Sequence, residues 1–202
     1  MDFYTNVCRT RDKILVTGYQ GNKRVKMKVD YRPKHFVPSR KGDTPYKSLD
    51  GRPLEVVELN SMGGARKFRE KYHQTAGMEI HGYDRYVYTY ISDKFPTDFE
   101  YDTKKVRIAT LDIECECEDG FPEPMIAGEK VNAIAIKPFG HNTHVFGLGP
   151  WDEKPANCVY YNCVDEAQLL TEFIKFWRKA SFDIITGWNV KFFDIPFLMN
   201  RF

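Results

Sequence analysis

Two carboxylates one residue apart, Asp112 and Glu114, are the side chains whose types and spacing most readily suggest chemistry. They close the run at residues 106–111, which is short, apolar and partly β-branched, as is typical of a β-strand. Because side chains alternate faces along a strand, Asp112 and Glu114 should lie on the same face. A divalent cation between them would relieve their mutual repulsion. The pair indicates half of a metal site, although a solvated strand end that runs into an acidic loop with Glu118 and Asp119 would have the same pattern.

A third carboxylate, Asp194, lies in the aromatic and apolar stretch 186–197, where an unpaired charge is costly. Pro196 suits the first turn of a helix, so Asp194 should lie at or next to the helix N-cap. A crossover from the first acidic strand can bring Asp194 to the same sheet edge as Asp112 and Glu114. Three carboxylates around two hard cations are the setting for phosphodiester hydrolysis, and all-oxygen ligands favour Mg²⁺ or Mn²⁺ over zinc.

The elements that must position these carboxylates follow a mixed α/β pattern. After the strand that ends at Asp112, the sequence predicts three more strands, an amphipathic helix that starts at Val164 or Asp165, a short buried strand and a last helix. A strand, a crossover helix and a further strand imply a partly parallel sheet. The additional strands are predicted at residues 131–136, 143–148, 158–163 and 183–187.

The first half of the sequence is typical of a β-rich domain, with Ser61 as the expected N-cap of a helix that runs to about Gln74. Residues 85–91 have tyrosines at alternate positions and predict another strand. Those tyrosines could stack the bases of DNA or RNA, or could simply pack a small core. The polar stretch before the acidic strand predicts a boundary between domains at residues 1–105 and 106–202. The other strands of this half are predicted at residues 2–9, 13–19, 23–29 and 54–59.

The charge of the chain is unevenly distributed. Residues 1–111 contain 22 Lys and Arg against 14 Asp and Glu, whereas residues 112–202 contain 8 against 14. A basic half suggests a polyanionic ligand, and an acidic half suits a pocket built from carboxylates.

Composition narrows the class of protein. Hydrophobic residues make up 42% of the 202 residues, which indicates a folded chain, and no apolar run is long enough to span a membrane. We therefore expect a cytoplasmic protein with no membrane partner and reduced cysteines. The pair His141 and His144 has no acidic or third partner beside it and is expected in a surface loop rather than a metal site.

Two ordered motifs carry a resemblance to a known family. Asp112-Ile113-Glu114 resembles the first exonuclease motif, and residues 189–194 the second, of the 3′→5′ proofreading domain of family B DNA polymerases. The flanking residues 120–124 and 186–189 resemble the phage replicative subgroup. The resemblance covers the whole chain.

The resemblance implies an α/β (α+β) fold. Residues 106–202 would form a mixed-sheet, ribonuclease-H-like exonuclease domain that is incomplete at its C-terminus. Residues 1–105 would form the β-rich N-terminal polymerase domain, with one or two helices. The third exonuclease motif of the family, a Tyr-x-x-x-Asp on a later helix, and the polymerisation residues are not found before Phe202.

The resemblance also implies roles for five residues. Asp112, Glu114 and Asp194 would be the catalytic metal ligands, with Asp112 best placed to bridge two Mg²⁺ or Mn²⁺ ions. Phe121 is similar to the aromatic that wedges against the terminal bases of the melted primer, although a loop aromatic that caps the core is an equal alternative. Asn189 would hydrogen-bond near the scissile end or brace the turn before Asp194.

The expected protein is then the N-terminal portion of a DNA-directed DNA polymerase that contains part of a proofreading site. Its partners would be the single-stranded 3′ end of a DNA primer and the remaining polymerase portion, in the host cytoplasm if a phage encodes it. Such a chain is expected to be weakly active or inactive alone. The competing hypothesis is an inactive module that binds nucleic acid, RNA included, or a polymerase subunit. A free-standing exonuclease of the same superfamily would need another source of carboxylates and is disfavoured by the long N-terminal domain.

Overall fold

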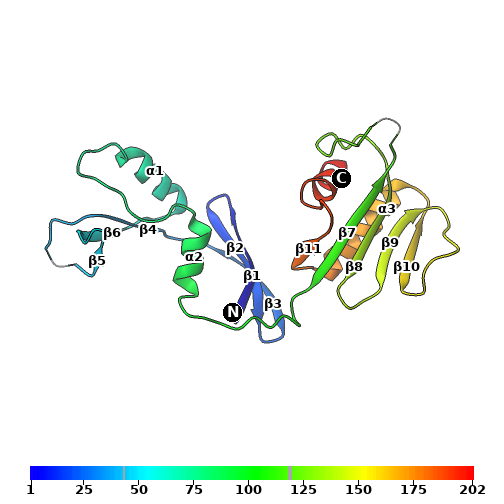
Figure 1. Ribbon diagram of the computed structural model, residues 1–202, viewed down its shortest axis with the longest axis horizontal. Coiled ribbons are helices and arrows are strands. Elements are labelled where there is room, and N and C mark those ends of the chain that lie inside the picture. Colours follow the sequence, from blue (N-terminus) through cyan, green and yellow to red (C-terminus); the bar gives the residue numbers. More distant parts are fainter. Residues whose placement is uncertain (43, 118–119) are drawn as a thin grey trace. The chain divides into compact units, whose positions relative to one another are not determined.

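The computed structural model describes residues 1–42, 44–117 and 120–202, and its contacts divide the chain into two compact units, residues 1–101 and 102–202 (Figure 1). Asp43, and Glu118 and Asp119 of the acidic loop considered above, lie outside the described residues. In the described part of the chain, no helix is both long and apolar enough to cross a membrane.

Unit 2 is built on one mixed sheet of five strands in the order β10-β9-β8-β7-β11. The central strand β8 runs antiparallel to both β7 and β9, whereas β10 is parallel to β9 and β11 is parallel to β7. The expected mixed sheet and each of its predicted strands are therefore confirmed. The strands are β7 (Ile108–Cys115), β8 (Val131–Pro138), β9 (Thr143–Leu148), β10 (Cys158–Cys163) and β11 (Ile184–Thr186).

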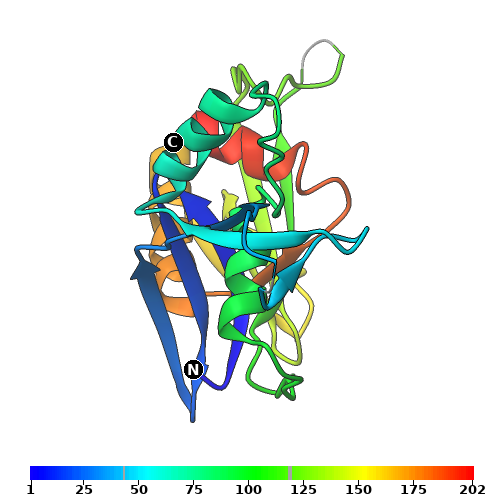
Figure 2. The ribbon, with the colours of Figure 1, turned by 90° about the vertical axis from the view of Figure 1, so that its left-hand side faces the viewer.

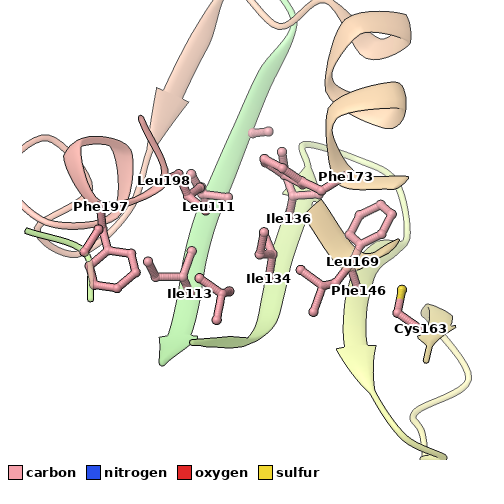
Figure 3. Packing of buried hydrophobic residues seen from close by; sticks show 13 residues of the cluster. Leu111, Ile113, Ile134, Ile136, Phe146, Cys163, Leu169, Phe173, Phe197 and Leu198 are labelled. Carbon is pink, nitrogen blue, oxygen red and sulfur yellow. The ribbon is translucent and has the colours of Figure 1, made fainter. Parts of the chain in front are cut away.

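Two helices cover the apolar face of this sheet: α3 (Glu166–Ala180) packs on β8, β9 and β10, and α4 (Asp194–Arg201) packs on β7. The expected start at Val164 or Asp165 is close: the N-cap of α3 is Asp165, whose side chain accepts a hydrogen bond from Gln168 N at 2.8 Å, and the helix begins at Glu166. Figure 3 shows Phe173 of α3 and Phe197 of α4 in the same buried cluster as Leu111 and Ile113 of β7. Burial of this cluster joins both helices to the strand of the two carboxylates.

The prediction that residues 183–187 form a buried strand was partly wrong. The strand exists as β11, but it is an edge strand, and Ile184 is 43% exposed. An apolar run of this length cannot by itself distinguish an edge strand from a central one.

The described residues of unit 1 form two three-stranded sheets and two helices, and Figure 2 shows the blue strands β1–β3 with the green helix α2. Its β-rich character is confirmed, as is the N-cap Ser61, whose side chain accepts a hydrogen bond from Gly64 N at 3.0 Å. Strand β4 was not predicted, because proline is unfavourable in most strand positions and β4 follows Pro33 and ends at Pro38. The elements are β1 (Phe3–Thr10), β2 (Lys13–Gln20), β3 (Lys23–Val29), β4 (Lys34–Pro38), β5 (Tyr46–Lys47), β6 (Pro53–Glu58), α1 (Met62–Tyr72) and α2 (Tyr86–Lys94).

The predicted strand at residues 85–91 was wrong, because this segment forms helix α2. Tyr86 and Tyr90, four residues apart, share one helix face and are buried, whereas Tyr88 is 57% exposed. The buried pair joins a core that includes Ile14 of β2. Alternate tyrosines fit a strand and also place every second one on a single helix face, and packing against the sheet decides between the two. No tyrosine-lined sheet face exists here, so the expectation of RNA contact loses its basis.

Candidate active site

Asp112 and Glu114 lie on the open face of β7. Their side chains are exposed, whereas the intervening Ile113 is 7% exposed and joins the core beneath the sheet. The register pairs Asp112 with Ala135 and Glu114 with Ala133 on β8. Because paired residues share a face, two small side chains neighbour the carboxylates and leave them accessible.

Asp194 approaches the same part of β7 from the edge of the strand that pairs with β11. It is the first residue of α4, next to the N-cap Phe193, as the sequence predicted. Its Oδ1 atom accepts a hydrogen bond from the N–H of Ile113 at 3.1 Å, and the side chain is only 2% exposed. The backbone group that Asp194 binds therefore lies between Asp112 and Glu114.

The end of β11 explains why this backbone group is available. The parallel pairing of β11 with β7 ends where Thr186 pairs with Thr110. Beyond that point the N–H of Ile113 has no strand partner on this side, and a buried N–H without an acceptor is costly. The Asp194 carboxylate supplies the acceptor that a longer β11 would have supplied.

The electrostatics of Asp194 reflect this crowding. Burial is the main reason that the pKa of Asp194 is raised above its usual value, and the negative charges of Asp112 and Glu114 raise it further. Backbone hydrogen bonds from Ile113 and from the N–H of Asp194 itself oppose this shift. A bound cation would offset both the repulsion and the lost hydration.

These carboxylates match a hard divalent cation in donor type, since all three offer oxygen atoms and Asp112 and Glu114 face solvent. They do not form a closed ligand set: within residues 1–42, 44–117 and 120–202, no three His, Cys, Asp or Glu side chains are arranged to hold a metal ion. The backbone brings the three positions together, and rotation of the two exposed side chains would be needed to converge on one ion. Their role as metal ligands stays a prediction.

The loop from β11 to α4 approaches β7 closely at Gly187. A Cβ atom at this position would lie 2.4 Å from the carbonyl oxygen of Leu111, so only glycine fits without displacement of the backbone. No role was expected for Gly187, although the residue stands in the flanking segment 186–189 that resembles the phage subgroup. This contact seats the loop beside the carboxylates.

Asn189 turns the same loop toward Asp194. It has a left-handed backbone with φ of 54°, which asparagine tolerates well, and its carbonyl oxygen accepts hydrogen bonds from the N–H groups of Phe192 and Phe193, both at 2.9 Å. The backbone of Asn189 therefore braces the turn before Asp194. Its side chain is exposed.

A salt bridge that the sequence analysis missed holds the far end of α4. Arg201 donates to both carboxylate oxygens of Glu166 on α3, at 2.8 and 2.7 Å, and also to the carbonyl oxygens of Ala127 and Gly128, both at 3.1 Å. Glu166 in turn accepts from the N–H of Val131 at 2.8 Å. This network fixes α4, and hence Asp194, against the sheet. A thirty-five-residue separation along the chain gave no sequence signal for it.

The model of the family described as DNA polymerase family B, exonuclease domain, matches residues 60–202. The chain belongs to this family. The expected resemblance is confirmed, and exonuclease domains of family B are in general metal-dependent nucleases. Matching residues include β7 and α4, the two elements that hold the three carboxylates.

The family relatives include DNA polymerases from phages. The DNA-directed DNA polymerases of Escherichia phage RB69 and Enterobacteria phage T4 are each 29% identical to this chain over 228 residues, which covers 99% of the chain and 25% of each relative. The DNA polymerase delta catalytic subunit of Caenorhabditis elegans is 35% identical over 105 residues, or 48% of this chain and 9% of that protein. The chain thus spans about a quarter of the length of its phage relatives.

The fold of the chain is also that of a family B polymerase. The structure of the family B DNA polymerase from the archaeon Pyrobaculum calidifontis matches with a TM-score of 0.69 over 97% of this chain and 31% of that one, at 20% sequence identity. The match confirms the expected α/β fold class.

Phe121, which the family B resemblance suggested as a wedge, lies near the carboxylates. Its ring packs against that of Phe193 with centroids 4.7 Å apart, and Phe193 directly precedes Asp194. Phe121 is 76% exposed, so most of its surface is free to contact a ligand. Its contact with a primer end stays a prediction.

Proposed function

We propose that this chain carries the metal-binding carboxylates of a 3′→5′ exonuclease that removes nucleotides from the single-stranded 3′ end of a DNA primer. One observation carries the proposal: the 3.1 Å hydrogen bond from Ile113 N–H to Asp194 Oδ1, which brings a buried carboxylate between Asp112 and Glu114. Two bound Mg²⁺ or Mn²⁺ ions would supply an activated water and stabilise the leaving oxygen of the phosphodiester.

The residues of the chain would divide the remaining work. Asp112 and Glu114, exposed beside small neighbours, would hold the ions, with Asp112 as the bridging ligand. Asp194, already oriented by Ile113, would add a third carboxylate. Phe121 would pack against the terminal base and keep the primer end unpaired. Asn189 would maintain the turn that presents Asp194.

The polymerase activity proposed for the whole protein would require regions that the chain does not match. The chain covers a quarter of its phage relatives, so the remaining polymerase portion is the proposed protein partner. If a phage encodes the protein, the proposed place of action is the host cytoplasm. Unit 1 would serve as the N-terminal polymerase domain.

A binding module without chemistry is the second candidate, and strand β3 is the observation that favours it. Lys23, Lys26 and Lys28 are exposed on this edge strand of a three-stranded sheet. Clustered cations on an edge strand attract a polyanion, and such binding weakens steeply with salt.

Digestion of a 3′-labelled single DNA strand with Mn²⁺ tests the proposal. Cleavage by the wild-type chain alone is expected to be weak or absent; where it occurs, Asp112→Asn should abolish it, and Asp152→Asn, the same change at an exposed loop carboxylate, should leave it intact. If the chain cleaves only when the remaining polymerase portion is added, the same pattern of variants is expected in the mixture. Cleavage that survives Asp112→Asn would overturn the proposal. DNA binding that depends on salt, with no cleavage under either condition, would favour the module.

A further inference from the structure

A pocket of about 820 Å³ opens in unit 2 near the start of β7, away from the carboxylates. It lies between the start of β7, the end of β8 and the end of α3. Ile108 lines it, and four residues of extended strand, about 13 Å, separate Ile108 from Asp112. The pocket is therefore separate from the candidate active site, and its volume is within the range of small-molecule sites, about 300–1,000 Å³.

Aromatic rings form one wall of the pocket. The ring of His144 packs on Phe176 with centroids 4.3 Å apart and stacks on Tyr161 with an interplanar angle of 21°. The Tyr161 hydroxyl lies 3.0 Å from His144 Nδ1, which fixes the imidazole in place. Phe139 also lines the pocket and is 84% exposed. The histidine that was expected in a surface loop is thus part of a packed aromatic wall.

The pocket is also lined by cationic side chains. Lys104, Arg107 and Lys179 line the pocket, and no Asp or Glu is among its lining residues in the described part of the chain. Arg107 is fixed by a hydrogen bond from its Nη1 to the carbonyl oxygen of Ala180 at 3.0 Å. Among residues that the structure describes, neither lysine ammonium forms a salt bridge. Two ammonium groups therefore remain to bind an external anion.

We propose that this pocket binds a nucleotide, with the base against the aromatic residues and the phosphate at Lys104 and Lys179. A bare anion would not need the aromatic wall, and an apolar ligand would not need the cations. A cationic ligand is excluded by the charge of the rim. Stacking on aromatic rings accepts every base, so the pocket should not select a sequence. The proposal is independent of the exonuclease function.

The nucleotide has two possible sources that share this chemistry, a free mononucleotide and one unit of a single strand. Equilibrium binding to the full chain in EDTA tests both, because chelation removes divalent ions from the carboxylates. The probes are 2′-deoxyadenosine 5′-monophosphate, deoxyadenosine, inorganic phosphate and an oligodeoxyadenylate. A strand as the source predicts that the oligonucleotide binds more tightly than the monophosphate, and a free nucleotide predicts equal or weaker binding of the oligonucleotide.

The variants locate the binding. We expect Lys179→Glu to weaken binding of the monophosphate by about tenfold or more, the loss typical of a charge-assisted contact. Arg178→Glu makes the same charge change on the adjacent, exposed residue of α3 and should leave binding unchanged. Phe139→Ala removes an exposed ring without a cost to the core and should also weaken binding. Equal effects of Lys179→Glu and Arg178→Glu, tight binding of deoxyadenosine or phosphate alone, or no binding of any probe would overturn the proposal.

Discussion

The two ends of strand β7 have opposite chemistry. At one end, Asp112 and Glu114 face solvent and Asp194 is buried beside them, so negative charge accumulates where hydration is limited. At the other end, Lys104 and Lys179 border an aromatic pocket that no carboxylate lines within the described residues. A single strand thus separates a place suited to cations from a place suited to anions. The difference shows that unit 2 has negative side chains at one end of β7 and positive side chains at the other. The net charge of the chain does not reveal this separation.

The largest expected effect is at the acidic end. Asp194→Asn keeps an oxygen acceptor for Ile113 N–H but removes the charge, so the fold should persist. Metal-dependent cleavage should fall by at least about 100-fold, because loss of a residue that only supports a metal ligand already costs up to about that much. Cleavage of a labelled strand, either by the chain alone or with the remaining polymerase portion, provides the rate.

A companion variant separates charge from structure. Asp194→Ala leaves the buried N–H of Ile113 without an acceptor and should also destabilise unit 2 by about 1–3 kcal/mol. Equal stability of the Asn and Ala variants in urea would contradict the structural role given to this hydrogen bond.

The next largest effect concerns how α4 is held. Arg201→Met leaves Glu166 half-buried without its bidentate partner and should lower the free energy of unfolding by about 2–4 kcal/mol. Arg178→Met, an exposed arginine on α3, is the matched control and should cost little. Chemical denaturation measures both, and a small effect of Arg201→Met would show that other contacts hold α4 against the sheet.

A smaller effect is expected from Gly187→Ala. The added Cβ would lie 2.4 Å from Leu111 O and must displace the loop, at a cost of about 1–3 kcal/mol and with a loss of Mn²⁺ affinity. Gly128→Ala, where the nearest atom is 3.8 Å from the added Cβ, is the control. Unchanged Mn²⁺ affinity in Gly187→Ala would separate the loop contact from the carboxylates.

The smallest effect is a gain in stability. Since the pKa of Asp194 is raised in the folded chain, chiefly by burial, its stabilising contribution is complete at low pH and is lost as the pH rises through the folded pKa. Asp194→Asn stays neutral, so its melting temperature without metal should exceed that of the wild type by a few degrees at pH 7. The difference should vanish in acid. A lower melting temperature at pH 7 would mean that the buried charge is compensated.

Local patterns predicted most elements of this fold. The side-chain oxygen of Ser61 identified the N-cap of α1, and an apolar stripe predicted the start of α3 to within two residues. Alternation predicted the faces of Asp112 and Glu114, because strand geometry alone sets them. The same reasoning failed for the segment that forms α2, because tyrosines at alternate positions are compatible with both a strand and a helix.

Features that depend on distant contacts could not be read from the sequence. The bond of Asp194 to Ile113 exists because β11 ends at Thr186, and no local pattern indicates where an edge strand ends. The pairing of Arg201 with Glu166 and the contact of Gly187 with Leu111 likewise need the assembled fold. The sequence identified the carboxylates, and the structure supplied the reason that they meet.

Calorimetric titration of the chain with Mn²⁺ tests most directly whether the three carboxylates form a cation site. Wild type should bind Mn²⁺, Asp112→Asn and Asp194→Asn should each weaken that binding by about 100-fold, and Asp152→Asn should leave it unchanged. Equal Mn²⁺ affinity in all four proteins would contradict a shared site for Asp112, Glu114 and Asp194.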